Sequence, residues 1–324
     1  MLRFLTNNPV WTRFLCMMTF QQLMATFPDE AACRTYLTMR RWPDGPRCPR
    51  CDNTKVYECG PSRPFHWQCL NCGKTKRAPY RFSVLVGTVF ENTNVPLLTW
   101  FKVLYTMLTA KKGISSRQIR RMFFGDNSSL HTAWYVGHRL RAGMQDDGFK
   151  QLMGIVEVDE TYIGGKDKNR HWSKKSRQQR EAKGTDEFGD KIGYGKVGVI
   201  GAIERKGNVV CKIIGQADAR TLAGFVRHAV NEKVSLVATD ENQGYNYIGR
   251  GIRHEAVKHS QGEYVRGEIH TNNIESFWAL LKRGIIGTYH NVSKKYLPLY
   301  LNEFQFRQNN RHNPDIFGTA IAGC

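Results

Sequence analysis

The sequence predicts an α/β protein in which a cysteine-rich segment and a helical region precede a mixed sheet flanked by helices. Three observations support this fold class. Strand-like apolar runs alternate with helical segments over residues 152–291, apolar residues recur at helical spacing over 94–143, and two CxxC pairs lie within 46–82. A chain of 324 residues has room for two or three domains.

The α/β part consists of short apolar runs bounded by turn-forming residues. Strands are expected at 154–163, 195–203, 208–214, 234–240 and about 253–258. A helix is expected at 220–231, since apolar residues recur there at one-face spacing, and another at 294–311 despite Pro298. Residues 166–194 are rich in bases and lack a core pattern, so we expect an exposed loop there.

Residues 90–145 are expected to form a helix-turn-helix unit, after an N-terminal helical segment at 1–45 that has a start signal at Pro28-Asp29-Glu30. Pro96 suits the start of the first helix, and Ser115 and Ser128 suit the caps of the next two. These two helices would bury the following residues: Ile119, Met122, Phe123, Leu130, Ala133, Trp134 and Gly137.

The two cysteine pairs have the spacing of a metal site. Each pair, Cys48 with Cys51 and Cys69 with Cys72, can grip one ion, and the 17 residues between them allow a hairpin to complete a tetrahedral site. Redox pairs or buried thiols are the alternatives. A closed four-cysteine site has no open position, so we expect one structural zinc ion in a zinc ribbon at 46–82, with Cys59 left over.

The net charge of +20 and the pI of about 9.7 indicate a polyanionic partner, with nucleic acid ahead of a membrane surface. No apolar run approaches the ~20 residues that span a bilayer. The nine cysteines fit a reducing compartment, because only four are paired by spacing and the others are scattered.

Three acids stand out by position. Asp159 and Asp240 each end an apolar strand candidate, and Glu275 lies in the amphipathic segment TNNIESFWALLKRG. Any one acid at a strand end is expected merely to face solvent. Two strand ends and a helix could, however, hold a pair of Mg²⁺ or Mn²⁺ ions that activate an attacking oxygen and stabilise a leaving oxygen.

Other acids and bases lie near these three residues in the sequence. Glu157 shares a strand face with Asp159 and is a candidate auxiliary carboxylate, whereas alternation turns Glu160 and Glu241 away. Lys282 shares a helical face with Glu275, so it either contacts phosphates or is a solvated helix residue. Three polar residues lie in the same neighbourhood, where they either orient ligands, touch substrate or are ordinary surface residues near a helix start: His270, Asn273 and His290.

Near the C-terminus, Glu303, Arg307 and Arg311 recur every four residues. This spacing fits a DNA-facing row as well as an i,i+4 ion-pair ladder.

The chain resembles the DDE transposases of bacterial insertion sequences, in the subgroup that has an N-terminal zinc ribbon and is related to the Merlin-type transposases. The resemblance runs from about residue 20 to 311. It rests on the stretches RWPDGPRCPRC, CLNCGKT, TAWYVGHRLRAGM, VEVDETYIGGK, ATDENQGY, HTNNIESFWALLKRGIIGTYHNVS and YLNEFQFRQNNR.

This resemblance implies an RNase H-like catalytic domain at 150–324, with metal ligands Asp159, Asp240 and Glu275 and a helper lysine at Lys282. Some relatives look to have Asn as the third ligand, which brings Asn273 into consideration. The resemblance also implies a cytoplasmic protein at the bacterial nucleoid.

The function expected on these grounds is that of a DNA transposase. It would bind terminal inverted repeats, cut the element ends and join them to target DNA, as a dimer or larger multimer. The helix around 128–140 would supply base contacts. Phosphate contacts are expected from the basic residues Arg117, Arg120, Arg121, Arg139, Arg141, Lys282, Arg307 and Arg311. The competing functions are a structure-specific nuclease and a non-catalytic DNA-binding regulator.

Overall fold

The structure is a computed structural model of the 324-residue chain. It describes residues 18–73, 75, 78–145, 150–164, 196–248, 251–257, 265–267 and 269–324. The basic loop expected at 166–194 and residues 1–17 lie outside these ranges. The chain forms two compact units, one of residues 1–145 with 310–324 and the other of residues 146–309.

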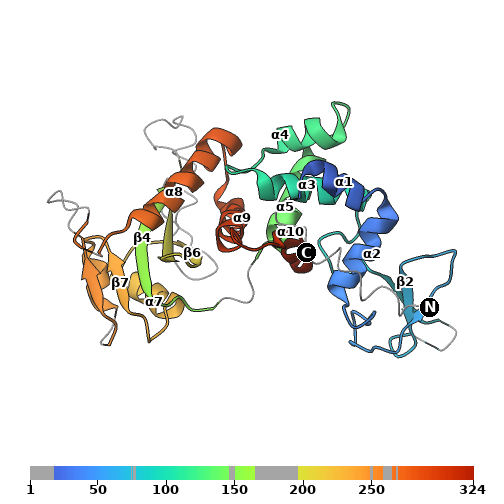
Figure 1. The fold of residues 1–324 in the computed structure, drawn as a ribbon, viewed down its shortest axis with the longest axis horizontal. Coiled ribbons are helices and arrows are strands. Elements are labelled where there is room, and N and C mark those ends of the chain that lie inside the picture. The colour runs from blue at the N-terminus through green and yellow to red at the C-terminus, as the bar shows by residue number, and fades with distance from the viewer. Residues whose placement is uncertain are drawn as a thin grey trace, which may run out of the picture. The chain divides into compact units, whose positions relative to one another are not determined.

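The second unit is built on a five-stranded mixed sheet (Figure 1) with the order β6-β5-β4-β7-β8. Its strands are β4 (Ile155–Ile163), β5 (Val197–Glu204), β6 (Val209–Ile214), β7 (Leu236–Thr239) and β8 (His254–Ala256). The strands β4, β5 and β6 are antiparallel neighbours, whereas β7 runs parallel to β4 and β8 parallel to β7. The predicted fold class, a mixed sheet flanked by helices behind a zinc ribbon, is confirmed.

Each face of this sheet packs against its own helices. Val156 and Val158 of β4 belong to an apolar cluster with helix α7 (Ala219–Ala229) and the 3-10 turn η3 (Gln243–Tyr247). The opposite face packs against α8 (Asn272–Gly284) and α9 (Leu297–Asn309). The approach of α8 is close at Gly201, because a Cβ atom there would lie 2.6 Å from the Trp278 ring.

Helix α9 also completes the edge of the sheet. Asn309 Oδ1 accepts from the Val209 amide at 2.8 Å, and Gln305 Oε1 accepts from the Cys211 amide at 2.9 Å. Side chains therefore satisfy backbone donors of edge strand β6 that have no neighbouring strand. The turns η5 (Ile285–Tyr289) and η6 (Lys294–Tyr296) connect α8 to α9.

The first unit is mainly helical. Its helices are α1 (Phe20–Thr26), α2 (Glu30–Arg41), α3 (Leu97–Thr109), α4 (Ser116–Ile119), α5 (Leu130–Gly143) and α10 (Ile316–Gly323). The predicted caps are found at Asp29 for α2 and at Ser115 for α4, whereas α5 is capped by Ser129 rather than Ser128. No helix of the described residues is long and apolar enough to cross a membrane.

Two side chains that we expected to be buried in the helix-turn-helix region are exposed. Met122 is 58% exposed and Leu130 is 38% exposed, so these two expectations are wrong. Residues Arg120–Phe124 form a π-helical turn (η1). A π turn has more residues than an α turn and shifts the helical face, which accounts for the outward position of Met122.

The zinc-ribbon segment contains a small antiparallel sheet of β1 (Tyr57–Glu58), β2 (His66–Cys69) and β3 (Tyr80–Ser83). Its core is aromatic: the ring centroids of Trp42 and Trp67 lie 5.2 Å apart, and Phe82 stacks on Trp67 at 6.2 Å. Trp42 directly follows α2, so the sheet packs on the end of that helix.

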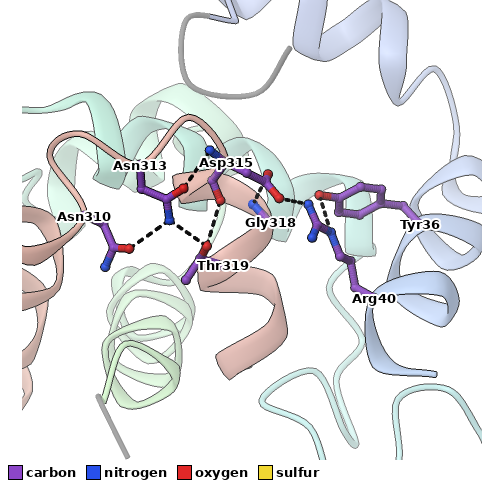
Figure 2. A network of polar contacts seen from close by, with 7 residues as sticks. All are labelled: Tyr36, Arg40, Asn310, Asn313, Asp315, Gly318 and Thr319. Atoms are coloured by element: carbon purple, nitrogen blue, oxygen red, sulfur yellow. Dashed lines mark hydrogen bonds and ion pairs between the residues drawn. The ribbon is translucent and has the colours of Figure 1, made fainter. Parts of the chain in front are cut away.

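The C-terminal residues 310–324 belong to the first unit, which differs from the domain boundary that we drew at 150–324. Figure 2 shows the polar network that holds them: Asp315 of the α10 cap pairs with Arg40 of α2, and Arg40 donates to the Tyr36 hydroxyl at 3.0 Å. The last residue is held too, because the Val89 amide donates to the Cys324 carbonyl at 2.6 Å. The chain thus returns to the first unit after completing the second.

Candidate metal centres and nucleic-acid contacts

Four cysteine sulfurs gather beside the small sheet. Cys48 Sγ lies 3.8 Å from Cys72 Sγ, and Cys51 Sγ lies 3.7 Å from Cys69 Sγ. All four sulfurs lie within 4.8 Å of one another. A tetrahedral zinc ion with Zn–S bonds of about 2.3 Å has edges of about 3.8 Å between sulfurs, so the cluster has the dimensions of a zinc site.

The environment of the sulfurs fits a structural metal. Cys48 and Cys69 are buried, and Cys51 is exposed. Hydrogen bonding to Cys51, burial and the nearby Cys48 raise the pKa of the Cys72 thiol to about 12. The Cys72 thiol therefore favours the protonated state until a cation binds. Cys59 is not part of the cluster, and none of the eight cysteines in the described chain forms a disulfide.

A second group of ligand atoms lies at the carboxyl end of β7, beside the central strand β4 of the large sheet. Carboxylate oxygens of Asp159, Glu160 and Asp240 lie within 4.8 Å of one another. The parallel register pairs Glu157 of β4 with Ala238 of β7, so two residues further along both strands Asp159 and Asp240 come level. Asp240 directly follows β7, so it lies just beyond the paired residues of that strand.

The charges of this group are close and only partly hydrated. Burial, together with the charges of Asp240 and Glu160 and a smaller contribution from Glu275, raises the pKa of Asp159 to about 7. Burial likewise raises the pKa of Glu160, against hydrogen bonds from Tyr245 and Asn242. Because the ligand atoms are all carboxylate oxygens, the group suits Mg²⁺ or Mn²⁺.

Glu275 lies in the first turn of α8, on the sheet face that also carries Asp159. It is exposed, and its Oε1 accepts from Thr271 Oγ1 at 2.8 Å. Glu275 is not one of the three residues of the compact group, but its charge is close enough to raise the pKa of Asp159. Strand β4, the end of β7 and the start of α8 therefore meet at one place.

Glu160 is the residue that sequence reasoning missed. Alternation along β4 does turn Glu160 to the α7 face, yet its carboxylate lies close to those of Asp159 and Asp240. Asn242 and Tyr245, in the turn after β7, donate to it at 2.9 and 2.5 Å. The acid doublet Asp159-Glu160 and the turn residues after Asp240 were the available signal.

Glu157 is buried and points to the α8 face, as alternation indicated. Its carboxylate accepts from the start of α8 rather than joining the compact acid group. His270 and Asn273 are both within contact of Glu157, and His290 is an exposed residue with a φ of 60°.

The bases expected to contact DNA fall into different environments. Arg117, Arg121 and Lys282 are exposed. Arg120 pairs with Asp126 at 3.4 Å. Arg139 donates to the Glu91 carbonyl at 2.8 Å and to the Tyr135 hydroxyl at 2.6 Å.

Arg141 must be removed from the set of DNA contacts, because it is only 1% exposed. Its guanidinium folds back along α5 over Gly137, where a Cβ atom would lie 3.1 Å from Arg141 Nη1. Arg307 is also mostly buried and pairs with Glu303 at 3.5 Å, which favours the ion-pair ladder over the DNA-facing row. Arg311 is half-buried in the first unit.

Comparisons with known proteins give the same division of the chain. Residues 151–309 match an ISXO2-like transposase domain, and residues 28–75 match a transposase zinc-ribbon domain. The first match coincides with the second compact unit. A relative from Halobacterium salinarum, described as an uncharacterised protein in transposable element ISH50, is 29% identical over 289 residues, which are 87% of this chain and 92% of the relative. The chain thus belongs to the insertion-sequence transposases that combine a zinc ribbon with an ISXO2-like transposase domain.

Proposed function

We propose that this transposase binds the terminal inverted repeats of its element, cleaves the element ends and transfers them to target DNA. The observation that carries the proposal is the meeting of Asp159, Asp240 and Glu275, which come from two strands and a helix. These are the residues expected to hold two Mg²⁺ or Mn²⁺ ions. When bound, such ions activate an attacking oxygen and stabilise the leaving oxygen of a phosphodiester.

The side chains divide the work between positioning and binding. Asp159 on β4 and Asp240 at the end of β7 lie level on neighbouring strands, and Glu275 completes the site from α8. Water cleaves the phosphodiester at the element end and leaves a 3′-hydroxyl, which then attacks target DNA. Lys282, exposed about two turns further along α8, contacts the phosphate backbone.

DNA recognition belongs to the first unit in this proposal. The ribbon, held by one structural zinc ion, and the helix α5 contact the inverted repeat. Arg117 and Arg121, both exposed near the π turn, bind phosphates. Two ends must be cut and joined together, so we propose that a dimer or larger multimer acts on DNA.

The test is a cleavage assay with Mg²⁺ on duplexes that carry the element end or an unrelated sequence. Asp159→Asn and Asp240→Asn are expected to lower end cleavage about a thousandfold, the effect of about 4 kcal/mol of lost transition-state stabilisation. Asn272→Ala, at an exposed position on the same helix as Glu275, is the matched control and keeps full activity.

The competing functions give different results in the same assay. Equal cutting of the unrelated duplex would indicate a structure-specific nuclease. Tight, specific binding without cutting by the wild type would indicate a regulator. Full cleavage by either aspartate variant would reject the assignment of the site.

A further inference from the structure

Strand β4 carries three acids within four positions, and only the middle one is explained by the proposed function. Glu157 and Asp159 face α8, and Glu160 faces α7 and η3. Glu157 and Glu160 are both inserted into other parts of the fold. What each of them holds is visible in its hydrogen-bond partners.

The carboxylate of Glu157 binds the beginning of α8. Its Oε2 accepts from the backbone amides of Asn273 at 2.8 Å and Ile274 at 3.3 Å, and its Oε1 accepts from Asn273 Nδ2 at 2.8 Å. The first amides of a helix have no partner within the helix and carry partial positive charge. A carboxylate on β4 therefore satisfies them and fixes the helix start on the strand.

Two further groups lie against the carboxylate of Glu157, which is 0% exposed. Arg205 Nε donates to Oε1 at 2.8 Å, and His270 Nδ1 lies 3.2 Å from the same oxygen. Arg205 also donates to the His270 carbonyl at 3.4 Å, so strand, connecting segment and helix start are joined. A buried carboxylate with this many partners has one orientation.

This connection sets the position of Glu275. Glu275 follows Asn273 by two residues, and its amide donates to the Thr271 carbonyl at 3.1 Å. Thr271 Oγ1 donates a hydrogen bond to the Glu275 carboxylate at 2.8 Å and so orients it. Glu157 thus fixes the helical turn that carries Glu275 at a defined distance from Asp159, two residues along β4.

Glu160 makes an equivalent connection on the other face, to the turn that follows β7. Its Oε1 accepts from Asn242 Nδ2 at 2.9 Å, and its Oε2 accepts from the hydroxyl of Tyr245, a residue that is 0% exposed within the α7-side core. The backbone amide of Asn242 in turn donates to Asp240 Oδ1 at 3.1 Å. Glu160 therefore fixes the residue that orients the Asp240 carboxylate.

We propose that Glu157 and Glu160 are positioning residues of the transposase site, Glu157 for the helix that bears Glu275 and Glu160 for the turn that bears Asp240. The catalytic meaning of this inference rests on the proposed function, whereas its structural content is the geometry of the metal site. In this view β4 supplies one ligand and places the two others. Each oxygen of Glu160 accepts from a side chain of the turn that follows β7, and these two contacts are the basis for assigning it a positioning role.

The experiment measures Mn²⁺ binding to the full-length protein without DNA, by electron paramagnetic resonance. Glu157→Gln and Glu160→Gln are each expected to weaken Mn²⁺ binding about tenfold, the usual loss when a residue behind a metal ligand is changed. The amide that replaces one oxygen would face Asn273 or Asn242 donors, so the connection is broken without a change of size.

Double variants separate positioning from direct coordination. If Glu157 acts through Glu275, then Glu157→Gln combined with Glu275→Gln binds Mn²⁺ no more weakly than Glu275→Gln alone. The same holds for Glu160→Gln with Asp240→Asn. A further tenfold loss in either double variant would overturn the positioning role for that residue.

A second pair of variants covers the outcome that Glu157→Gln fails to fold. Asn273→Ala removes one donor to Glu157 and leaves the Arg205 pair in place, and it is expected to weaken Mn²⁺ binding about threefold to tenfold. Asn272→Ala, its exposed neighbour, leaves Mn²⁺ binding unchanged. Equal effects of the two variants would contradict the proposal. Because no DNA is present, a protein that binds Mn²⁺ as described but cuts no DNA would refute the proposed function and leave this inference standing.

Discussion

The two units of the chain each gather a set of metal-ligand side chains, and the two sets are built in opposite ways. In the first unit, four sulfurs come from residues 48–72 of one hairpin and form a closed tetrahedron. In the second, carboxylates come from positions 159, 160 and 240, with Glu275 nearby, and face one another with like charge. The first arrangement stabilises a fold, whereas the second depends on a fold to exist.

This difference explains why only the acid site is electrostatically unfavourable without a cation. A thiol is neutral when it is protonated, and the raised pKa of Cys72 favours that form when no cation is bound. Asp159 shares its partly buried site with two other acids; burial and their charges raise its pKa, and a bound cation would offset this repulsion. In the proposed function, the second unit must therefore hold acids that repel one another, and residues behind them, such as Glu157, stabilise their arrangement.

The largest expected effect concerns the sulfur cluster. Cys69→Ser should unfold the ribbon, since a structural zinc site supplies about 10–16 kcal/mol of apparent folding free energy. We expect zinc content to fall to zero and specific binding to the element end to be lost. Mn²⁺ binding by the second unit should remain within twofold of the wild type. Loss of Mn²⁺ binding together with zinc would show that the two sites are not independent.

The acid site gives the next largest effect, on stability rather than activity. Folding raises the pKa of Asp159 from 3.8 to about 7, so the folded protein holds this proton more tightly than the unfolded chain does. In Mg²⁺-free buffer, the free energy of unfolding should therefore fall as the pH rises from about 4 to about 7. Above that range the expected loss of unfolding free energy is about 2 kcal/mol. A shift of three pKa units corresponds to about 4 kcal/mol, and half is taken because Asp159 is only partly buried and water screens its charge.

Asp159→Asn removes this titration and is expected to be more stable than the wild type at pH 8, by about 2 kcal/mol in thermal or urea unfolding. Saturating Mg²⁺ should reverse the order, because only the wild type gains from binding. A wild type that is as stable as the variant at pH 8 without Mg²⁺ would mean that ionised Asp159 is not destabilised by burial and by the neighbouring acids.

The smallest expected effect lies in DNA binding by the first unit. Arg117→Ala and Arg121→Ala should each lower the slope of log K against log salt concentration by about 1, since each removes one phosphate contact. Arg120→Ala should change the slope less, because Asp126 already pairs with Arg120 at 3.4 Å. Fluorescence anisotropy with the element end measures the slopes, and identical values for all three variants would argue against contacts at these positions.

How far the sequence predicts each unit follows from the range of the interactions. The CxxC pairs and the caps at Asp29 and Ser115 are local patterns, and the structure agrees with them. The apolar runs before Asp159 and Asp240 predicted β4 and β7, but β4 continues past Asp159 to Ile163, so Asp159 lies within the central strand and not at its end. These features depend on residues that are near in the chain.

The features that the sequence did not predict depend on tertiary contacts. Arg141 lies in a basic helix and looked like a surface residue, but the space over Gly137 admits its side chain to the core. Alternation turns Glu160 away from Asp159, but Tyr245, in the turn after β7, donates to its carboxylate, which lies close to those of Asp159 and Asp240. The return of residues 310–324 to the first unit depends on the pair of Arg40 with Asp315, which no local pattern reveals.

The most direct test of the central claim is a crystal structure of the Mn²⁺-loaded protein with anomalous scattering recorded at the manganese edge. We expect peaks between the carboxylates of Asp159 and Asp240, with Glu275 within reach of one of them, and no such peak in Asp240→Asn. A loaded protein whose manganese lies elsewhere, or whose acid cluster stays empty at saturating Mn²⁺, would contradict the assignment of this acid cluster as the catalytic centre.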